Sequence, residues 1–122
     1  LWRAALDGSS LTPVVWGTHQ ANGVGLSPDG SVLYAAETHD GRLWAWDLAA
    51  DGSVPAGGAP GRTHEGRLLH DTDGLLFDSL GVDGGGWVCV ATIGPGGGVT
   101  CVAPDGSASE RAMSPGRRGA IW

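Results

Sequence analysis

The stretch ANGVGLSPDGSVLYAAET, residues 21–38, decides the fold because it holds two short apolar runs separated by a tight turn. Asp-Gly, at Asp29 and Gly30 in this turn, is favoured in tight hairpins because both residues tolerate positive φ. We therefore expect strands near 23–27 and 32–37. A polar residue, Asn22, stands just before the first strand, and its position needs an explanation.

The Asp-Gly dipeptide recurs along the chain. Seven of the ten Asp residues are followed by Gly, and most successive pairs are 11 or 22 residues apart. Turns at such intervals are typical of a meander of short antiparallel strands, and no window shows a sustained helical period. The sequence thus predicts an all-β protein, with further strands near 2–6, 12–16, 42–48, 67–70, 79–83, 87–92 and 99–103.

Composition limits the class of protein. The 122 residues carry a net charge of -6, with seven Arg and no Lys, so neither nucleic acid nor an anionic membrane is an expected partner. No apolar run approaches the roughly 20 residues that span a bilayer, and no signal-peptide pattern is visible. We expect a cytoplasmic protein. Because the chain starts at Leu1 without Met, we also expect it to be part of a longer one.

An internal repeat organises the strands. Residues 21–52 align with 77–106, which places Asn22 over Asp78 at an offset of 56 residues (78 − 22). Each copy contains most of a four-stranded propeller blade, and blades stack because one alone cannot bury both faces. We divide the chain into the end of one blade (1–16), a blade with a long surface loop at 49–66 (17–66), the next blade (67–106) and a truncated or divergent tail (107–122).

The repeat suggests a role for Asn22 and Asp78. The innermost strand of a propeller blade starts at the central channel, so the residue that heads it faces the channel mouth. Two oxygen donors from adjacent blades suit a hard cation such as calcium. The alternative is that each residue caps a local turn, Asn22 with Gly23 and Asp78 with Ser79.

Two segments carry a family resemblance. ANGVGLSPDGSVLYAAETHDGRLWAWDL and FDSLGVDGGGWVCVATIGPGGGV resemble consecutive blades of the senescence marker protein (regucalcin), gluconolactonase and lactonase family. The most specific parts are Asn22-Gly23 with the following SPDG, and Asp78 with Asp83. The resemblance covers roughly residues 1–106 and implies a fragment of a six-bladed β-propeller with four-stranded antiparallel blades. It also implies one divalent cation in the channel, with calcium the expected metal and zinc the alternative.

The resemblance assigns roles by position. Asn22 matches a metal-binding Asn, and Asp78 matches the Asp that binds the metal and acts as catalytic base. Ser79 matches a residue that lies at the metal or its water in some lactonases. The family takes a Glu and a further Asn or Asp ligand from earlier blades, which are absent here.

These roles imply a metal-dependent hydrolase of small-molecule sugar lactones, with this chain expected to be inactive alone. The alternative is a non-catalytic propeller that binds a small ligand or a protein through its channel face.

Histidines and cysteines add weaker signals. His19, three residues before Asn22, is expected at the channel rim, while the other His residues have no zinc-ligand spacing with Cys. Cys89 and Cys101 flank a hairpin about symmetrically, so a disulfide across the strands is one alternative. We expect two reduced, buried thiols instead, as in an intracellular enzyme.

Overall fold

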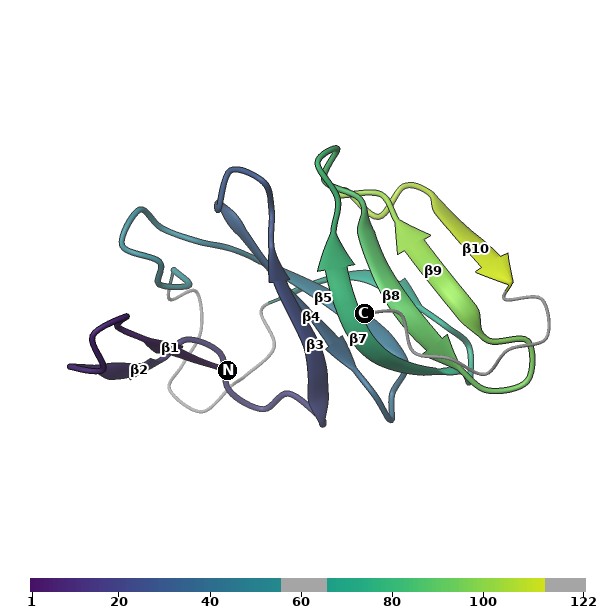
Figure 1. The fold of residues 1–122 in the computed structure, drawn as a ribbon, viewed down its shortest axis with the longest axis horizontal. Coiled ribbons are helices and arrows are strands. Elements are labelled where there is room, and N and C mark those ends of the chain that lie inside the picture. Colours follow the sequence, from purple (N-terminus) through teal and green to yellow (C-terminus); the bar gives the residue numbers. More distant parts are fainter. Residues whose placement is uncertain (56–65, 114–122) are drawn as a thin grey trace.

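The computed structural model describes residues 1–55 and 66–113, and all regular structure in these ranges is β-strand. The strands are Trp2–Ala4 (β1), Leu11–Pro13 (β2), Ala21–Leu26 (β3), Val32–Glu37 (β4), Arg42–Asp47 (β5), Arg67–Asp71 (β6), Leu76–Val82 (β7), Val88–Ile93 (β8), Gly98–Val102 (β9) and Ser109–Met113 (β10). They form a β1–β2 hairpin and two four-stranded antiparallel sheets, which confirms the predicted fold class (Figure 1). Within the same ranges no helix is long and apolar enough to cross a bilayer.

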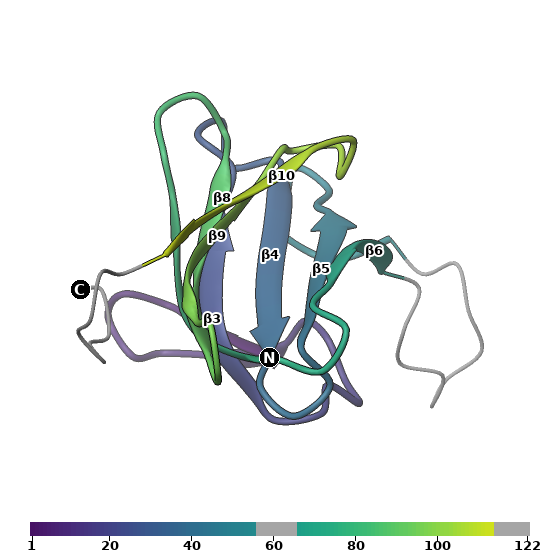
Figure 2. The same ribbon diagram turned by 90° about the vertical axis from the view of Figure 1, so that its right-hand side faces the viewer.

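The two four-stranded sheets have the same topology. Their strand orders are β3-β4-β5-β6 and β7-β8-β9-β10, so each is a simple antiparallel meander like a propeller blade. Strands β3 and β7, which begin the two meanders, lie side by side where the sheets meet (Figure 1). Seen from the side of β10, β8 and β9 of the second sheet overlap β3, and β4 and β5 of the first sheet lie beside them (Figure 2).

The sheets divide the chain differently from the predicted blades. Arg67–Asp71 pairs with β5 and completes the first sheet, whereas the prediction gave it to the next blade. Ser109–Met113 pairs with β9 and completes the second sheet, whereas the prediction placed it in a divergent tail. The segment that forms β6 was predicted as a strand, near 67–70, but placed in the wrong sheet, whereas β10 is exposed along its described side chains and lacks the apolar alternation that predicts a strand. The remainder of the predicted loop and tail, 56–65 and 114–122, lies outside the described residues.

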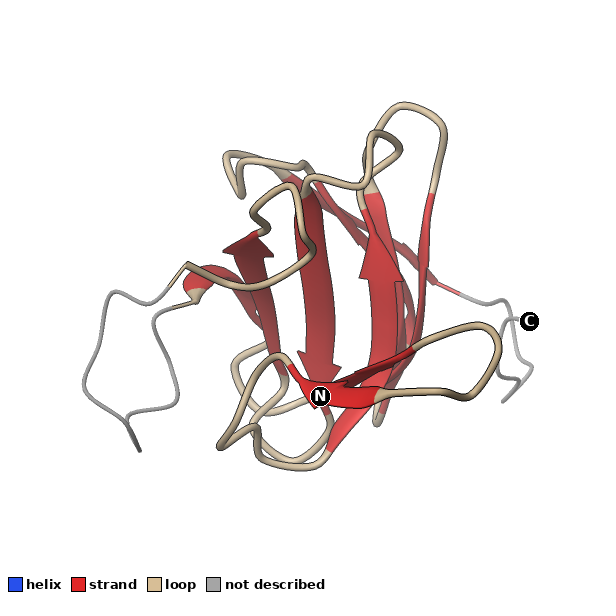
Figure 3. Cartoon of the chain, turned by 90° about the vertical axis from the view of Figure 1, so that its left-hand side faces the viewer, coloured by secondary structure: helices blue, strands red, loops and turns tan. Residues whose placement is uncertain are grey.

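The main core lies between the two sheets. Because side chains alternate across a strand, Tyr34 and Ala36 of β4 face the second sheet, where they meet Phe77 and Val90. The opposite face of β4 also packs: it presents Leu33 and Ala35 to a second cluster that includes Val15 and Trp46. The N-terminal segment and the β1–β2 hairpin lie over this side of the first sheet (Figure 3). The first sheet is therefore covered on both faces, as an internal blade must be.

The Asp-Gly turns form, but with a backbone other than the predicted one. Gly30 has φ of 74°, and Gly8, Gly52 and Gly106 have nearly the same value, while Asp73 is the one Asp at positive φ in the described ranges. Asp29 instead uses its carboxylate, which accepts the Ser27 hydroxyl at 2.6 Å and the Ser31 N–H at 3.0 Å. These bonds lower the pKa of Asp29 to about 2. The Asp side chain stabilises the turn, and only the Gly needs the left-handed conformation.

Strands β3 and β7 approach each other most closely at Gly23. A Cβ atom at this position would lie 2.4 Å from Cβ of Leu80 and 2.7 Å from the carbonyl oxygen of Asp78, well inside van der Waals contact. At Gly25 it would meet the Leu80 side chain at 2.7 Å. The two strands can approach this closely only because β3 has no side chain here.

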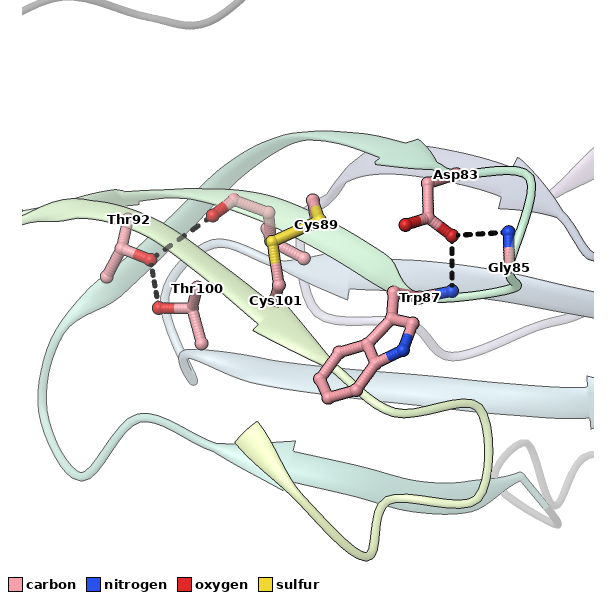
Figure 4. The surroundings of a disulfide bond; sticks show 8 residues. Asp83, Gly85, Trp87, Cys89, Thr92, Thr100 and Cys101 are labelled. Carbon is pink, nitrogen blue, oxygen red and sulfur yellow. Dashed lines mark hydrogen bonds between the residues drawn. A yellow bond between two sulfur atoms is a disulfide. The ribbon is translucent and has the colours of Figure 1, made fainter. Parts of the chain in front are cut away.

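A disulfide joins Cys89 and Cys101 (Figure 4). The two residues are direct partners in the β8–β9 register, with Cα atoms 4.0 Å apart, so both side chains leave the same face of the sheet. That face points away from the core residues Val88 and Val90, and both cysteines are half-buried. The prediction of two reduced, buried thiols is therefore wrong, because the β8–β9 register brings the two sulfurs within bonding distance.

Loss of the disulfide should destabilise the second sheet. A Cys89→Ser/Cys101→Ser double variant is expected to lose about 2–4 kcal/mol of unfolding free energy, because the cross-link no longer restricts the unfolded chain. Denaturant unfolding with and without dithiothreitol measures this, and the reductant should affect only the wild type. Two alkylatable thiols in the native, unreduced protein would contradict the pairing.

Gly23→Ala should separate β3 from β7. The added methyl overlaps Leu80 and the β7 backbone, so we expect a loss of about 1–3 kcal/mol of stability. Gly81→Ala is the matched control, because Gly81 lies on β7 with nothing within 4 Å of a Cβ atom. Thermal unfolding of both variants provides the test. Equal stability of the two variants would show that the close approach at Gly23 is not required.

Candidate metal and catalytic site

Asn22 and Asp78 meet across the interface between the two sheets. The side-chain amide of Asn22, on β3, donates a hydrogen bond from Nδ2 to Oδ1 of Asp78, on β7, at 2.5 Å. The sequence placed these residues at equivalent positions 56 apart, and the structure brings their side chains together. Both lie inside strands, so neither caps a turn. Their roles as metal ligands, and that of Asp78 as base, stay predictions.

Each residue lies in a β-bulge, and the two bulges are equivalent. The pairing register of β3 with β4 shifts between Ala21 and Val24, so two residues, Asn22 among them, oppose one on the partner strand. The register of β7 with β8 shifts in the same way between Phe77 and Leu80. A bulge bends the strand and redirects its side chains. The repeat therefore reproduces the β-bulge as well as the strand, and the bulge contains the polar residue in each copy.

Ser79 shares the second bulge with Asp78. Both residues are half-buried, while Asn22 is exposed. Ser79 follows Asp78 in the chain, and its contact with a metal or a metal-bound water stays a prediction. The bulge nevertheless places a hydroxyl and a carboxylate on consecutive residues at the interface.

Antiparallel topology determines which connections share the end of the sheets where Asn22 and Asp78 lie. Both residues are near the start of their strands, so the segments entering β3 and β7 lie at this end. The turns that follow β4 and β8 return to it as well. The connections at this end are 14–20, 38–41, 72–75 and 94–97.

His19 lies in the first of these connections and is held at two points. Its ring Nδ1 is 3.0 Å from Oδ2 of Asp40, in the turn after β4, and its side chain is 73% exposed. Its backbone N–H donates to Oε1 of Glu37 at 2.6 Å. The structure thus places His19 at the same end as Asn22, where the sequence predicted a rim residue.

Glu37 and Asp40 were missed as partners of His19. Glu37 is only 1% exposed, and its second oxygen accepts the indole N–H of Trp44 at 2.8 Å. The sequence signal for Glu37 was a charged residue at the end of an apolar strand. Such a carboxylate, when buried, must be hydrogen-bonded, so partners for it were to be expected. Asp40 had been counted only as part of an Asp-Gly turn.

A chain of charges continues from Asp40 across the first sheet. Arg42 lies 3.8 Å from Asp40 and 3.1 Å from Asp71, on the outermost strand. The backbone N–H of Asp73, followed by the Arg42 guanidinium, holds the pKa of Asp71 below its ordinary value. These groups are well exposed to solvent, so each ion pair adds little to stability. With two carboxylates to one guanidinium, these groups give this end of the sheet an acidic character.

The side-chain types of Asn22 and Asp78 suit a hard cation. An amide oxygen and a carboxylate are ligands that calcium prefers, whereas zinc favours nitrogen and sulfur. Calcium takes roughly six to eight oxygen ligands, so these two residues supply part of a set. In the ranges 1–55 and 66–113, no group of three or more His, Cys, Asp or Glu side chains is arranged to hold a metal.

Comparison with known proteins gives a consistent result. Residues 1–121 match the family described as SMP-30/Gluconolactonase/LRE-like region. A gluconolactonase from Xanthomonas campestris, described as important in glucose secondary metabolic pathways, is 28% identical with a TM-score of 0.72, and the match covers 94% of this chain and 34% of that one. An X-ray structure of a provisionally named gluconolactonase is 26% identical with a TM-score of 0.69, over 93% and 34% of the two chains. No curated protein sequence matches significantly.

The chain spans about a third of the length of these solved relatives, and its two four-stranded sheets correspond to two blades of their propeller fold. The family match covers nearly every residue and agrees with the fold. The chain therefore belongs to the SMP-30/gluconolactonase/LRE-like family.

Proposed function

We propose that the full-length protein is a divalent-cation-dependent hydrolase of sugar lactones, with calcium rather than zinc as the metal. The observation that carries this proposal is the contact between Asn22 and Asp78 at equivalent bulges of two neighbouring inner strands. Membership of the family and likeness to a gluconolactonase support it. Two donors fall short of a calcium coordination shell, so we expect the 122 residues alone to be inactive.

A lactone is a cyclic ester, so its hydrolysis needs a polarised carbonyl, an activated water and a stabilised oxyanion. A divalent cation held by Asn22 and Asp78 would polarise the carbonyl and lower the pKa of a bound water. Asn22 contributes a neutral oxygen, which keeps the site electrophilic. Asp78 accepts the proton of the attacking water as general base. Ser79, next in the bulge, would orient that water with its hydroxyl.

The test is hydrolysis of glucono-δ-lactone by the full-length protein, followed as proton release. We expect chelation to abolish turnover and calcium to restore it. Asp78→Asn and Asn22→Ala should each lower kcat at least about 100-fold, because each removes a ligand and Asp78→Asn also removes the base. His39→Gln, an exposed position in the turn after β4, is the control and should keep full activity.

Full turnover of Asp78→Ala would exclude this mechanism. Absence of metal-dependent turnover on glucono-δ-lactone and other simple lactones would favour the alternative, a propeller that binds a small ligand or a protein without catalysis. Calorimetry with calcium, run in parallel, tells the two causes of inactivity apart. Absence of calcium binding means that the metal site is wrong, whereas calcium binding without turnover means that the substrate is wrong.

A further inference from the structure

The seven Asp-Gly dipeptides expose this chain to a reaction of the backbone itself. The main-chain nitrogen of the residue after an aspartate can attack the side-chain carboxyl carbon and close a cyclic succinimide. Glycine in that position favours the reaction, because no Cβ atom obstructs the approach. The ring closes through the protonated carboxyl, since its hydroxyl leaves as water. Hydrolysis of the ring gives either aspartate or isoaspartate, in which the main chain runs through the side-chain carbonyl.

Four of these dipeptides have both reacting groups engaged in hydrogen bonds. In each of them the carboxylate accepts the N–H of the Ser two positions later, and the Gly N–H donates to the carbonyl three residues earlier. The four aspartates are Asp7, Asp29, Asp51 and Asp105. Bonds from serine hydroxyls, followed by the Ser N–H, lower the pKa of all four carboxyls, to about 2 at Asp29. A carboxyl that stays ionised is a poor electrophile, so these turns resist the reaction.

Two further dipeptides have the carboxylate engaged. Asp40 contacts the ring of His19 at 3.0 Å. Oδ1 of Asp83 accepts two backbone N–H groups, those of Gly85 at 2.8 Å and Trp87 at 2.9 Å (Figure 4). In both turns the carboxyl must leave these partners before it can reach the following nitrogen.

Asp73 and Gly74 differ from the other dipeptides at both reacting groups. Within residues 1–55 and 66–113, the Asp73 carboxylate makes no hydrogen bond or ion pair, and the Gly74 N–H donates none. Both residues are exposed, and a Cβ atom at Gly74 would meet nothing within 4 Å. The carboxyl carbon and the nitrogen can therefore come together without breaking a hydrogen bond.

The backbone at Asp73 adds to this reactivity. Its φ of 55° is a left-handed conformation that few non-glycine residues adopt. The chain is held on either side of it: the Asp73 N–H donates to Oδ1 of Asp71 at 3.0 Å, and the Thr72 hydroxyl donates to the carbonyl of Leu75. An isoaspartyl linkage adds a carbon to the main chain, so the residue no longer has to adopt this conformation.

We propose that Asp73 is a site of spontaneous isoaspartate formation in the folded protein. The nitrogen of Gly74 forms a bond to Cγ of Asp73 as the bond from Cγ to its hydroxyl oxygen breaks. The hydroxyl leaves as water with the proton of that nitrogen. A second water then attacks the main-chain carbonyl carbon of Asp73, its bond to the nitrogen breaks, and this carbonyl becomes a free carboxylate. The reaction needs no cofactor, so the inference goes beyond the proposed function and does not depend on it.

The modification would change the connection that enters β7. This connection, 72–75, packs against the turn after β4, where the Thr72 N–H donates to the carbonyl of Gly41 at 3.0 Å. The strand that follows carries Asp78. An extra main-chain carbon lengthens the connection, so we expect it to hold the start of β7 less firmly.

Peptide mapping of the full-length protein, after prolonged incubation in the folded state at neutral pH, tests the proposal. Endoproteinase Asp-N cleaves before aspartate but not before isoaspartate, so the modification leaves fragment 71–77 uncut at Asp73. We expect at least about tenfold more isoaspartate at Asp73 than at Asp29 or Asp105, because two kinds of hydrogen bond must break at each of those turns. In urea, where the turns are lost, the sites should react alike.

Two variants test the protection and the consequence. Ser27→Ala/Ser31→Ala removes two hydroxyl bonds to Asp29 and should raise isoaspartate there about threefold or more, with no change at Asp73. Asp73→Gly suits the positive φ and cannot isomerise. Prolonged incubation should therefore lower the melting temperature of the wild type and leave that of Asp73→Gly unchanged.

Three results would contradict these expectations. An intact Asp73 after incubation, or equal isoaspartate at Asp73 and Asp29 in the folded protein, would overturn the proposal. The same distribution in urea as in the folded state would show that the fold does not select the site, which also overturns it. Equal losses of melting temperature in the wild type and Asp73→Gly would refute the effect on β7.

Discussion

The close approach of β3 and β7 at Gly23 is the contact on which the candidate site depends. Any side chain at this position would overlap Leu80 and the backbone of β7. Without one, the two inner strands come near enough for Asn22 to bond Asp78 directly. The site therefore belongs to neither sheet: each contributes one polar residue, and the packing between sheets sets the distance. Substitutions in the core between the sheets should act on the site through this distance.

The equivalent bulges explain how a repeated fold makes an asymmetric site. The same local distortion occurs in both inner strands, yet it holds a neutral amide in one and a carboxylate in the other. Two carboxylates this close would repel and raise the pKa of one of them, which would weaken the proposed cation binding and base function. With Asn22 as the partner, Asp78 instead accepts a hydrogen bond. The repeat places a polar residue at the same bulge in both strands, and the difference between the copies makes one of them an amide and the other a carboxylate.

Local sequence patterns predicted the inner strands, whereas features that depend on pairing between distant segments were not predicted. Alternating apolar residues and Asp-Gly turns located β3, β4, β8 and β9 because those signals lie within a few residues. Strand β10 is exposed and polar, so it was missed; β6 was predicted as a strand, but its pairing with β5 is non-local and it was placed with the next blade. The Asn22 and Asp78 pair was predictable from the 56-residue repeat, whereas the bulges and the contact of His19 with Asp40 depend on strand register. Cysteine pairing also depends on register, which composition does not contain.

The buried carboxylate of Glu37 connects the rim of the candidate site to the core. A charge that is 1% exposed is tolerated only when its oxygens are hydrogen-bonded, and the donors here are the His19 backbone and the Trp44 indole. Trp44 packs in the second cluster, on the face of the first sheet away from the main core. The position of the segment entering β3 is therefore set by the need to satisfy Glu37, and the orientation of His19 toward Asp40 follows from that position. An irregular segment can in this way be held in place by hydrogen bonds to a buried carboxylate.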